Sequence, residues 1–389
     1  MQLSGRFDVN KISRLRLRLF GIAALAIAAA GLSAPAGAVY IQTNLVSDIA
    51  GLAAITDASL KNPWGLSHTP TSPFWVSDQG TNRATLYNVT AAGVVTKNPL
   101  EVTMPTTASG PQGPTGQIFN PTTSFQLSGG GIPNFIFANL NGTISAWNNT
   151  IGTAAQLRVT TPGAVYTGLA IGTSAAGPTL YAANGPGNRI DVFNGTYAPV
   201  TLAGSFATPP AISALGLVPF NVQNIGNSIY VTYAPAGGRP TQIHVPEGTG
   251  AVAEFDTNGN LIRTIIGSKL ASPWGIVQAP AAFGPFSSSL LVGNFSFDAS
   301  EINAFDFATG ALLGTIPINV GPGNTSGGLW GLILGNAGNN GSPNNVYFAD
   351  GINGEADGLF ASLAFVPEPA SIALLGLGLL GVGFTRRRT

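Results

Sequence analysis

Short stretches in which apolar and polar residues alternate recur through the middle of the chain. Residues 143–148 (TISAWN), 189–194 (RIDVFN) and 301–306 (EINAFD) place an apolar side chain at every second position, as a strand with one buried face does. Runs such as FIFA and SIYV are more continuously apolar, which is typical of strands covered on both faces. Asn-Gly and Thr-Gly pairs mark hairpin turns. The pattern predicts an all-β fold of short strands.

One phrase of sequence recurs six times. Residues 62–95 and 272–316 both begin with a small residue and Pro-Trp-Gly, followed by an apolar strand, a loop, a second strand ending in Asp or Asn, and two further strands. Weaker copies fill the gaps. The reference positions of the six units lie 51 to 56 residues apart: Trp64, Thr115, Thr167, Phe220, Trp274 and Trp330. Units of nearly constant length are the sequence signature of a β-propeller with one four-stranded antiparallel sheet per unit.

The two ends of the repeat array complement each other. The last unit runs out after its third strand, at residues 359–365, and the segment YIQTNLVS at 40–47 precedes the first unit as a spare strand. We therefore predict a six-bladed β-propeller over residues 39–365, with the N-terminal mature strand completing blade six and removing an open sheet edge. The phrase pattern resembles that of NHL-type six-bladed propellers. A seven-bladed ring would need one more repeat than we find.

The N-terminal residues predict export. Lys11, Arg14, Arg16 and Arg18 precede an apolar run at 19–32, and Ala-Gly-Ala at 36–38 resembles a cleavage site. These are the three parts of a signal peptide, here residues 1–38, which signal peptidase would remove. The alternative is a signal anchor that is not cleaved. With either outcome, a cytoplasmic role is disfavoured.

The C-terminal residues 366–389 predict sorting. Pro367, Glu368 and Pro369 interrupt regular structure, an apolar run of 13 residues follows, and Arg386, Arg387 and Arg388 come next. The run is short for a membrane span, which needs about 20 apolar residues, and the arginines favour the cytoplasmic side. This order resembles the PEP-CTERM sorting signal of Gram-negative bacteria. The resemblance implies transient anchoring in the inner membrane, cleavage by an exosortase, and a final place at the cell surface or outside the cell. The alternative is a tail anchor that is never cut.

Composition narrows the partners. Residues 39–366 contain eight Lys and Arg against fourteen Asp and Glu, a formal charge of −6, with no basic run. Nucleic acid and anionic membrane surfaces are therefore poor candidates. The chain has no cysteine, which excludes thiol catalysis and cysteine-based metal sites. No cofactor is indicated with certainty.

Two sets of residues are candidates for a ligand site, because the loop into each inner strand and the turn after each second strand share one face of a propeller. The first set contains aromatic residues, and the second set ends the second strands. A mouth with both would suit a sugar or Ca²⁺. The alternative is structural: Asp and Asn form turns, and the tryptophans wedge between blades. The sets are Trp64, Trp274 and Trp330, and Asp78, Asn139, Asn184, Tyr233, Asn294 and Asp350.

The loop 234–250 is longer than its counterparts and is the first candidate for specificity. It carries Arg239, His244 and Glu247. His244 and His68 are the only histidines and lie in different units, so a metal site or a Ser-His-Asp triad has little support. The loops with Asp298 and Glu301, and with Glu355 and Asp357, offer carboxylates for a cation or are simply solvated turns.

Three functions fit these features. The leading hypothesis is a non-enzymatic, exported propeller that binds exopolysaccharide or another matrix component. The first alternative is a Ca²⁺-dependent, lactonase-like hydrolase whose ion would be held by the Asp and Asn residues of the second set, although the glutamate expected in lactonases has no counterpart at a strand end. The second alternative is a purely structural surface protein. Fold alone does not separate the three.

Overall fold

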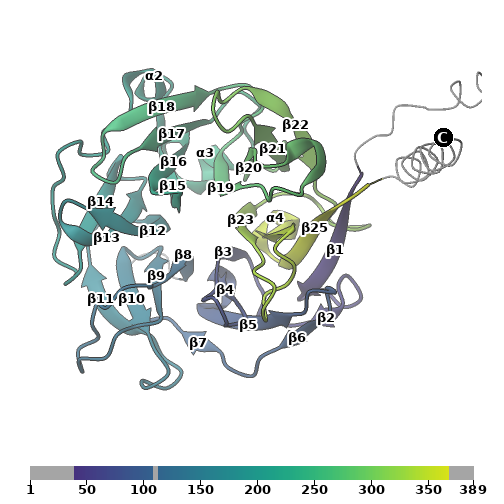
Figure 1. The fold of residues 1–389 in the computed structure, drawn as a ribbon, viewed down its shortest axis with the longest axis horizontal. Coiled ribbons are helices and arrows are strands. Elements are labelled where there is room, and N and C mark those ends of the chain that lie inside the picture. The colour runs from purple at the N-terminus through teal and green to yellow at the C-terminus, as the bar shows by residue number, and fades with distance from the viewer. Residues whose placement is uncertain (1–38, 108–112, 368–389) are drawn as a thin grey trace, which may run out of the picture. The chain divides into compact units, whose positions relative to one another are not determined.

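The computed structural model describes residues 39–107 and 113–367, with only the backbone of Val39. Its compact unit, Tyr40–Phe365, is a ring of six β-sheets arranged like blades around an axis (Figure 1). The all-β, six-bladed propeller prediction is confirmed. The predicted signal peptide and the sorting residues from Glu368 onward lie outside the described residues.

Each blade starts with a strand at the axis and proceeds outward. The inner strands are β3 (Pro63–Ser67), β8 (Pro114–Phe119), β12 (Tyr166–Ser174), β15 (Leu217–Ile225), β19 (Pro273–Gln278) and β23 (Leu329–Leu334). The second strands are β4 (Phe74–Asp78), β9 (Phe135–Asn139), β13 (Gly177–Asn184), β16 (Ser228–Pro235), β20 (Leu290–Asn294) and β24 (Asn345–Asp350). The third strands are β5 (Arg83–Val89), β10 (Thr143–Trp147), β14 (Arg189–Asn194), β17 (Ala251–Phe255), β21 (Glu301–Phe305) and β25 (Leu359–Val366).

The outer positions vary more between blades. Four blades have an outer strand from their own repeat: β6 (Val95–Lys97), β11 (Gln156–Thr160), β18 (Leu261–Ile266) and β22 (Leu312–Pro317). In blade three, which is β12 to β14, a single bridge between Phe193 and Pro199 stands in that place. In blade one, β7 (Val102–Thr103) also pairs with β5.

The N-terminal strand closes the ring, as predicted. β1 (Val39–Ser47) lies beside β25 in the sheet of blade six, and β2 (Ile55–Thr56) pairs with β1 in parallel. The end of β1 is tied to the β24–β25 turn. The Ser47 hydroxyl donates to the Gly358 carbonyl at 2.7 Å, and the Gly358 amide donates to Asp48 Oδ1 at 2.8 Å. Lys61 Nζ pairs with Asp48 Oδ2 at 2.5 Å. Residues from both ends of the unit therefore hold blade six together.

Glycines let neighbouring inner strands approach each other closely. A Cβ added at Gly65 would lie 2.3 Å from the Thr115 carbonyl oxygen, and one at Gly116 would lie 2.3 Å from the Leu169 amide nitrogen. The repeated glycine of the Pro-Trp-Gly phrase is therefore required by backbone packing. Blade four has Asn221 at the same place, and its Nδ2 donates to the Trp274 carbonyl at 2.8 Å.

The hydrophobic core lies between the blades. For example, Trp75 of blade one stacks on Phe135 of blade two at 4.1 Å between ring centroids, and both are about 2 % exposed. Burial of such side chains is the main stabilising contribution, about 25 cal/mol per Å² of apolar surface. It holds the propeller together without disulfides.

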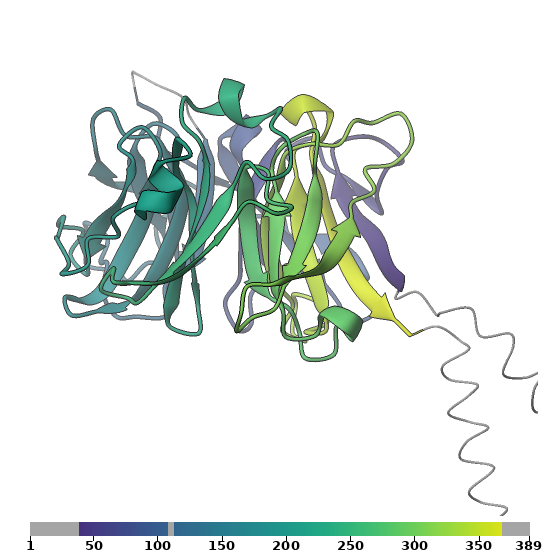
Figure 2. The ribbon, with the colours of Figure 1, turned by 90° about the horizontal axis from the view of Figure 1, so that it is seen from above.

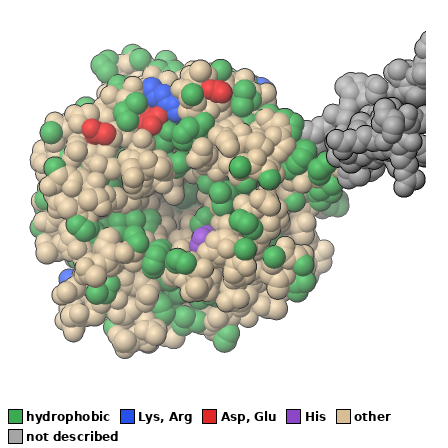
Figure 3. All heavy atoms as spheres, viewed as in Figure 1, with side chains coloured by type: hydrophobic (Ala, Val, Ile, Leu, Met, Phe, Trp, Pro, Cys, Tyr) green, Lys and Arg blue, Asp and Glu red, His purple; other side chains and the backbone are tan. Residues whose placement is uncertain are grey.

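Short helices distinguish the two faces of the ring. α3 (Arg239–Gln242) and α4 (Ile352–Glu355) lie on one face, here called the mouth face, and η2 (Gly284–Phe286) lies on the other (Figure 2). α2 (Pro210–Ser213) precedes β15, and η1 (Gln79–Thr81) follows β4. The face opposite the mouth is hollowed at its centre and has few charged side chains (Figure 3). Among residues 39–107 and 113–367, no helix is long and apolar enough to cross a bilayer.

Candidate functional site

The two predicted sets of residues meet at one end of the strands. In every blade, the residue that ends or nearly ends the second strand pairs with the start of the inner strand. The pairs are Pro63 with Asp78, Pro114 with Asn139, Tyr166 with Asn184, Pro219 with Tyr233, Pro273 with Asn294, and Leu329 with Asp350. A register shift follows each pair, at the reference position of the repeat. The two sets therefore lie at the same end of the strands, as the sequence pattern predicts.

The second set does not line the mouth. All six side chains are buried, with at most 1 % exposed. Side chains two positions apart lie on the same face of a strand. Asp78 therefore lies on the same face of β4 as Val76, which packs between blades one and six. Asp350 lies on the same face of β24 as Phe348, which packs between blades five and six. The set therefore occupies the interfaces between blades.

The three asparagines of this set form hydrogen bonds with neighbouring loops and strands. Asn294 Nδ2 donates to the Lys269 carbonyl at 2.8 Å, and Asn184 Nδ2 donates to Asp191 Oδ2 at 2.8 Å. Asn139 Nδ2 reaches Thr143 Oγ1 at 3.1 Å. These bonds match the structural alternative for the set.

The two aspartates and the tyrosine of the set have different surroundings. No hydrogen bond satisfies the carboxyl oxygens of Asp78 and Asp350 or the hydroxyl of Tyr233 within the described part of the chain. Burial raises the pKa of both carboxyl groups well above the ordinary value. Burial also raises the pKa of Tyr233.

The three tryptophans of the first set converge near the axis. The rings of Trp64 and Trp330 stack at 3.5 Å, and Trp274 meets them edge-on at 6.0 and 5.5 Å. Phe220 and Phe295 pack against Trp330. We call these five residues the aromatic cluster. Its tryptophans are 1 to 6 % exposed.

Indole hydrogen bonds tie this cluster across the ring. Trp274 Nε1 donates to the Thr167 carbonyl and Trp330 Nε1 to Asn62 Oδ1, both at 2.9 Å. Trp64 Nε1 is buried with no partner among the described residues. The cluster therefore has one donor left over.

A large cavity opens on the mouth face over this cluster. It has a volume of about 1020 Å³, a size typical of ligand sites. Trp64, Phe220 and Trp330 line it, together with Asn62, Arg239 and Glu355. We call it the mouth cavity.

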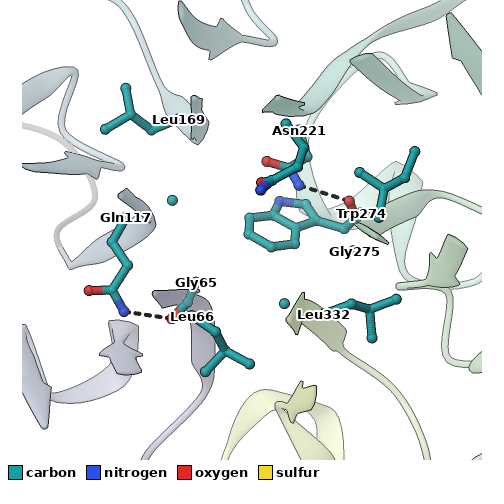
Figure 4. Close-up of a pocket in the computed structure, with 12 residues that line it drawn as sticks. Gly65, Leu66, Gln117, Leu169, Asn221, Trp274, Gly275 and Leu332 are labelled. Carbon is teal, nitrogen blue, oxygen red and sulfur yellow. Dashed lines mark hydrogen bonds between the residues drawn. The ribbon is translucent and has the colours of Figure 1, made fainter. Parts of the chain in front are cut away.

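The channel narrows further along the inner strands. A cavity of only about 20 Å³ lies there. Figure 4 shows the Trp274 ring between Gln117, whose Nε2 donates to the Gly65 carbonyl at 2.8 Å, and Asn221. The space for a ligand is therefore at the mouth.

Glu355 and Arg239 form an ion pair in the wall of the mouth cavity. Arg239 comes from α3 of blade four and Glu355 from α4 of blade six, so the pair spans blade five. Arg239 Nη2 also donates to the Gly354 carbonyl at 2.9 Å, and Asn62 Nδ2 lies 3.3 Å from Glu355 Oε1. Burial raises the pKa of Glu355, and Arg239 offsets part of that rise.

The sequence analysis identified only part of this site. It proposed Arg239 for specificity and Trp64, Trp274 and Trp330 for the mouth. Arg239, Trp64 and Trp330 line the cavity, whereas Trp274 lines the narrow part of the channel. It treated Glu355 as one possible cation ligand and missed Asn62. The sequence feature that pointed to Glu355 was its position in a loop expected on the mouth face.

The other candidates in the long loop lie apart from the cavity. His244 Nδ1 lies 2.9 Å from Asp298 Oδ1, and both side chains are more than half exposed. Glu247 pairs with Lys269 at 2.5 Å. Neither His244 nor Glu247 lines the mouth cavity.

The calcium ligands expected from the sequence are not gathered at the mouth. The proposed ligands of the second set lie in separate blade interfaces. Within residues 39–107 and 113–367, no three His, Asp or Glu side chains are grouped so that they could hold a metal ion.

Comparison with known proteins decides the nature of the C-terminus. Residues 365–388 match the family model described as the PEP-CTERM protein-sorting motif. This chain carries a PEP-CTERM sorting signal. The signal indicates an exported protein that is transiently anchored in a membrane, and it implies processing by an exosortase. Pro367, Glu368, Pro369 and the three arginines lie within the match. The signal peptide remains a prediction.

The propeller itself is similar to viral proteins. Uncharacterized proteins R648 and L690 of Acanthamoeba polyphaga mimivirus are each 28 % identical to this chain, over 82 % of this chain and 78 % and 84 % of theirs. A solved structure of a protein of unknown function from Bacteroides thetaiotaomicron aligns with a TM-score of 0.49 at 12 % identity, covering 85 % of this chain and 77 % of that one.

Proposed function

We propose that this protein is a non-enzymatic binding module at the cell surface or outside the cell. Its ligand site is the mouth cavity, and its ligand is exopolysaccharide or another component of the extracellular matrix. The sorting signal supports the location, because in the family that the tail resembles it accompanies production of extracellular polymer. The proposal does not extend to a Ca²⁺-dependent hydrolase, because the candidate ligands do not lie together.

One observation carries the proposal: the mouth cavity combines an aromatic floor with uncharged amide groups and a single ion pair. The apolar face of a sugar packs on aromatic rings, and its hydroxyls need both donors and acceptors. Asn62 and Gln242 supply amides, and all members of the aromatic cluster except Trp274 supply the floor.

The course of the last strand supports access to this cavity. β25 begins at Leu359, which pairs with Asp350 on the mouth face. It runs to Phe365 on the opposite face (Figure 2). The propeller therefore ends on the side away from the mouth cavity, and a polymer can reach the cavity without crossing that end.

Calorimetric titration of residues 39–366 with the polysaccharide of the host tests the proposal. Ala356 is exposed and lines the cavity, so Ala356→Trp would fill the space without disturbing the core. We expect this variant to lose at least about tenfold in affinity, which corresponds to about 1.4 kcal/mol. Ala91→Trp is the matched control, at an exposed turn that is not part of the cavity. Absence of binding, or equal binding by both variants, would contradict the proposal.

A further inference from the structure

Glu355 is held at the mouth cavity by an unusual backbone. Asn353, Gly354 and Glu355 have φ values of 56°, 67° and 69°, which is the left-handed region. Residues other than glycine adopt it at a cost of about 1–2 kcal/mol. Such strain is frequent at binding sites, where the surrounding structure enforces it. Here it accompanies a carboxyl group that is 7 % exposed in the wall of a large cavity.

The carboxylate has acceptor capacity to spare. An ionised carboxylate offers about four acceptor positions. Arg239 Nε binds Oε2, and Asn62 Nδ2 lies 3.3 Å from Oε1. About two positions are therefore available for groups that donate hydrogen bonds from the cavity.

Arg239 is held beside the Glu355 carboxylate by contacts within the protein. Its guanidinium also bonds the Gly354 carbonyl and lies 5.8 Å from the centre of the Phe297 ring. Arg239 and Glu355 are the charged residues that line the cavity. Because their charges are opposite, the net charge of the cavity lining is zero. A ligand with its own carboxylate would compete with Glu355 for Arg239 and would be repelled by Glu355.

The aromatic side of the cavity favours the same kind of ligand. Trp64 lines the cavity, and its indole N–H is buried with no acceptor within the described part of the chain. An unsatisfied buried donor costs about 1–3 kcal/mol. A small rotation of the ring toward a ligand oxygen would remove that cost.

We propose that the mouth cavity selects neutral sugars, and that neighbouring hydroxyl groups of the sugar donate hydrogen bonds to the Glu355 carboxylate. The ring face of the sugar packs on the aromatic cluster, and Arg239 favours the ionised form of Glu355 and orients its carboxylate. This inference rests on the proposed function and names its ligand class. It places a specificity-determining residue on α4, in contact with Arg239 of the loop 234–250.

The test compares neutral and uronate-containing oligosaccharides of equal length by calorimetry with residues 39–366. We expect the neutral series to bind more tightly. Glu355→Gln keeps the size of the side chain but removes the charge, and we expect it to weaken neutral sugars by about tenfold or more, as loss of a charge-assisted hydrogen bond does. Asp298→Asn is the matched control, since Asp298 is an exposed acidic residue outside the cavity. Thermal unfolding of each variant establishes that it is folded.

The outcomes separate this inference from the proposed function. Tighter binding of uronates, or neutral sugars bound equally by wild type and Glu355→Gln, would overturn the role of Glu355 and leave the binding function standing. If neither series binds to the folded wild-type protein, both proposals fail. Should Glu355→Gln not fold, Asn62→Ala provides a second variant with the same expected direction, because Asn62 Nδ2 also contacts the carboxylate.

Discussion

Asp78 and Asp350 occupy equivalent places in adjacent blades, and the carboxyl group of each is fully buried. Three other blades have asparagine at this position, where it forms hydrogen bonds. No hydrogen bond satisfies either carboxyl group within the described residues, and burial raises the pKa of both well above the ordinary value. The two aspartates should therefore make the stability of the propeller depend on pH.

We expect Asp350→Asn to raise the stability of the propeller at neutral pH. Burial raises the pKa of Asp350 in the folded state, so its favourable contribution is present below the unfolded pKa of about 3.9 and is lost as pH rises. We expect a gain on the order of 1 kcal/mol, the typical size of a single-residue effect on stability, because asparagine cannot ionise. Thermal unfolding at pH 7 and pH 4 should show a larger gain at pH 7.

Asp306→Asn is the control for this experiment. Hydrogen bonds from Thr309 lower the pKa of Asp306, so its contribution is present at neutral pH and is lost as pH falls. We expect the opposite sign from Asp350→Asn. A destabilisation by Asp350→Asn that is equal at both pH values would contradict the prediction.

The tie between Asp48 and Gly358 should stabilise ring closure. Asp48→Ala removes the acceptor of the Gly358 amide and the partner of Lys61. We expect a loss of about 1–3 kcal/mol, since a buried donor is left unsatisfied. Chemical unfolding measures the loss, and faster hydrogen exchange in β1 would locate it. Asp298→Ala, in an exposed pair with His244, should change stability by less than about 0.5 kcal/mol. Equal effects of the two variants would refute the closure role.

Close approach of the inner strands makes Gly116→Ala destabilising. The added Cβ would lie 2.3 Å from the Leu169 amide nitrogen and 2.8 Å from the Gly168 carbonyl carbon, and backbone atoms cannot rotate away. We expect a loss of about 1–3 kcal/mol or more. Gly129→Ala is the comparison, because nothing lies within 4 Å of its Cβ position. Thermal unfolding distinguishes them, and a neutral Gly116→Ala would contradict the packing argument.

Replacement of Pro367 and Pro369 by alanine should prevent removal of the sorting signal. Both residues lie in the matched motif, and the family resemblance implies that the exosortase recognises the Pro-Glu-Pro segment. We expect the double variant to remain in the membrane fraction with its C-terminal residues intact, as measured by mass spectrometry in a host with an exosortase. Pro246→Ala, at an exposed loop position, should be processed normally. Normal processing of the double variant would contradict the role of the two prolines in removal of the sorting signal.

Repeat length, strand alternation and the spare strand at 40–47 were sufficient to predict six blades and their closure. Strand pairing depends on local periodicity and on turns, both of which are read directly from a chain. The repeat pattern also predicted that the start of each inner strand and the end of each second strand, such as Pro63 and Asp78, lie on the same face of the ring. The reason for the repeated glycine, close contact between inner strands, needed the assembled ring.

The direction of the side chains and the ligand site depended on tertiary structure. Because strand side chains alternate between the two faces of a blade, one residue of register decides which neighbouring blade Asp78 faces, and each blade has a register shift at that end. Glu355 meets Arg239 across 116 residues of chain; the Asn353-Gly354 pair marks a turn in the sequence, but not the partner that this turn brings to Glu355. The sequence by itself determined which strands form and how they close the ring, since these follow from local periodicity. Only the folded ring decided which side chains face the cavity, because that depends on contacts between distant blades.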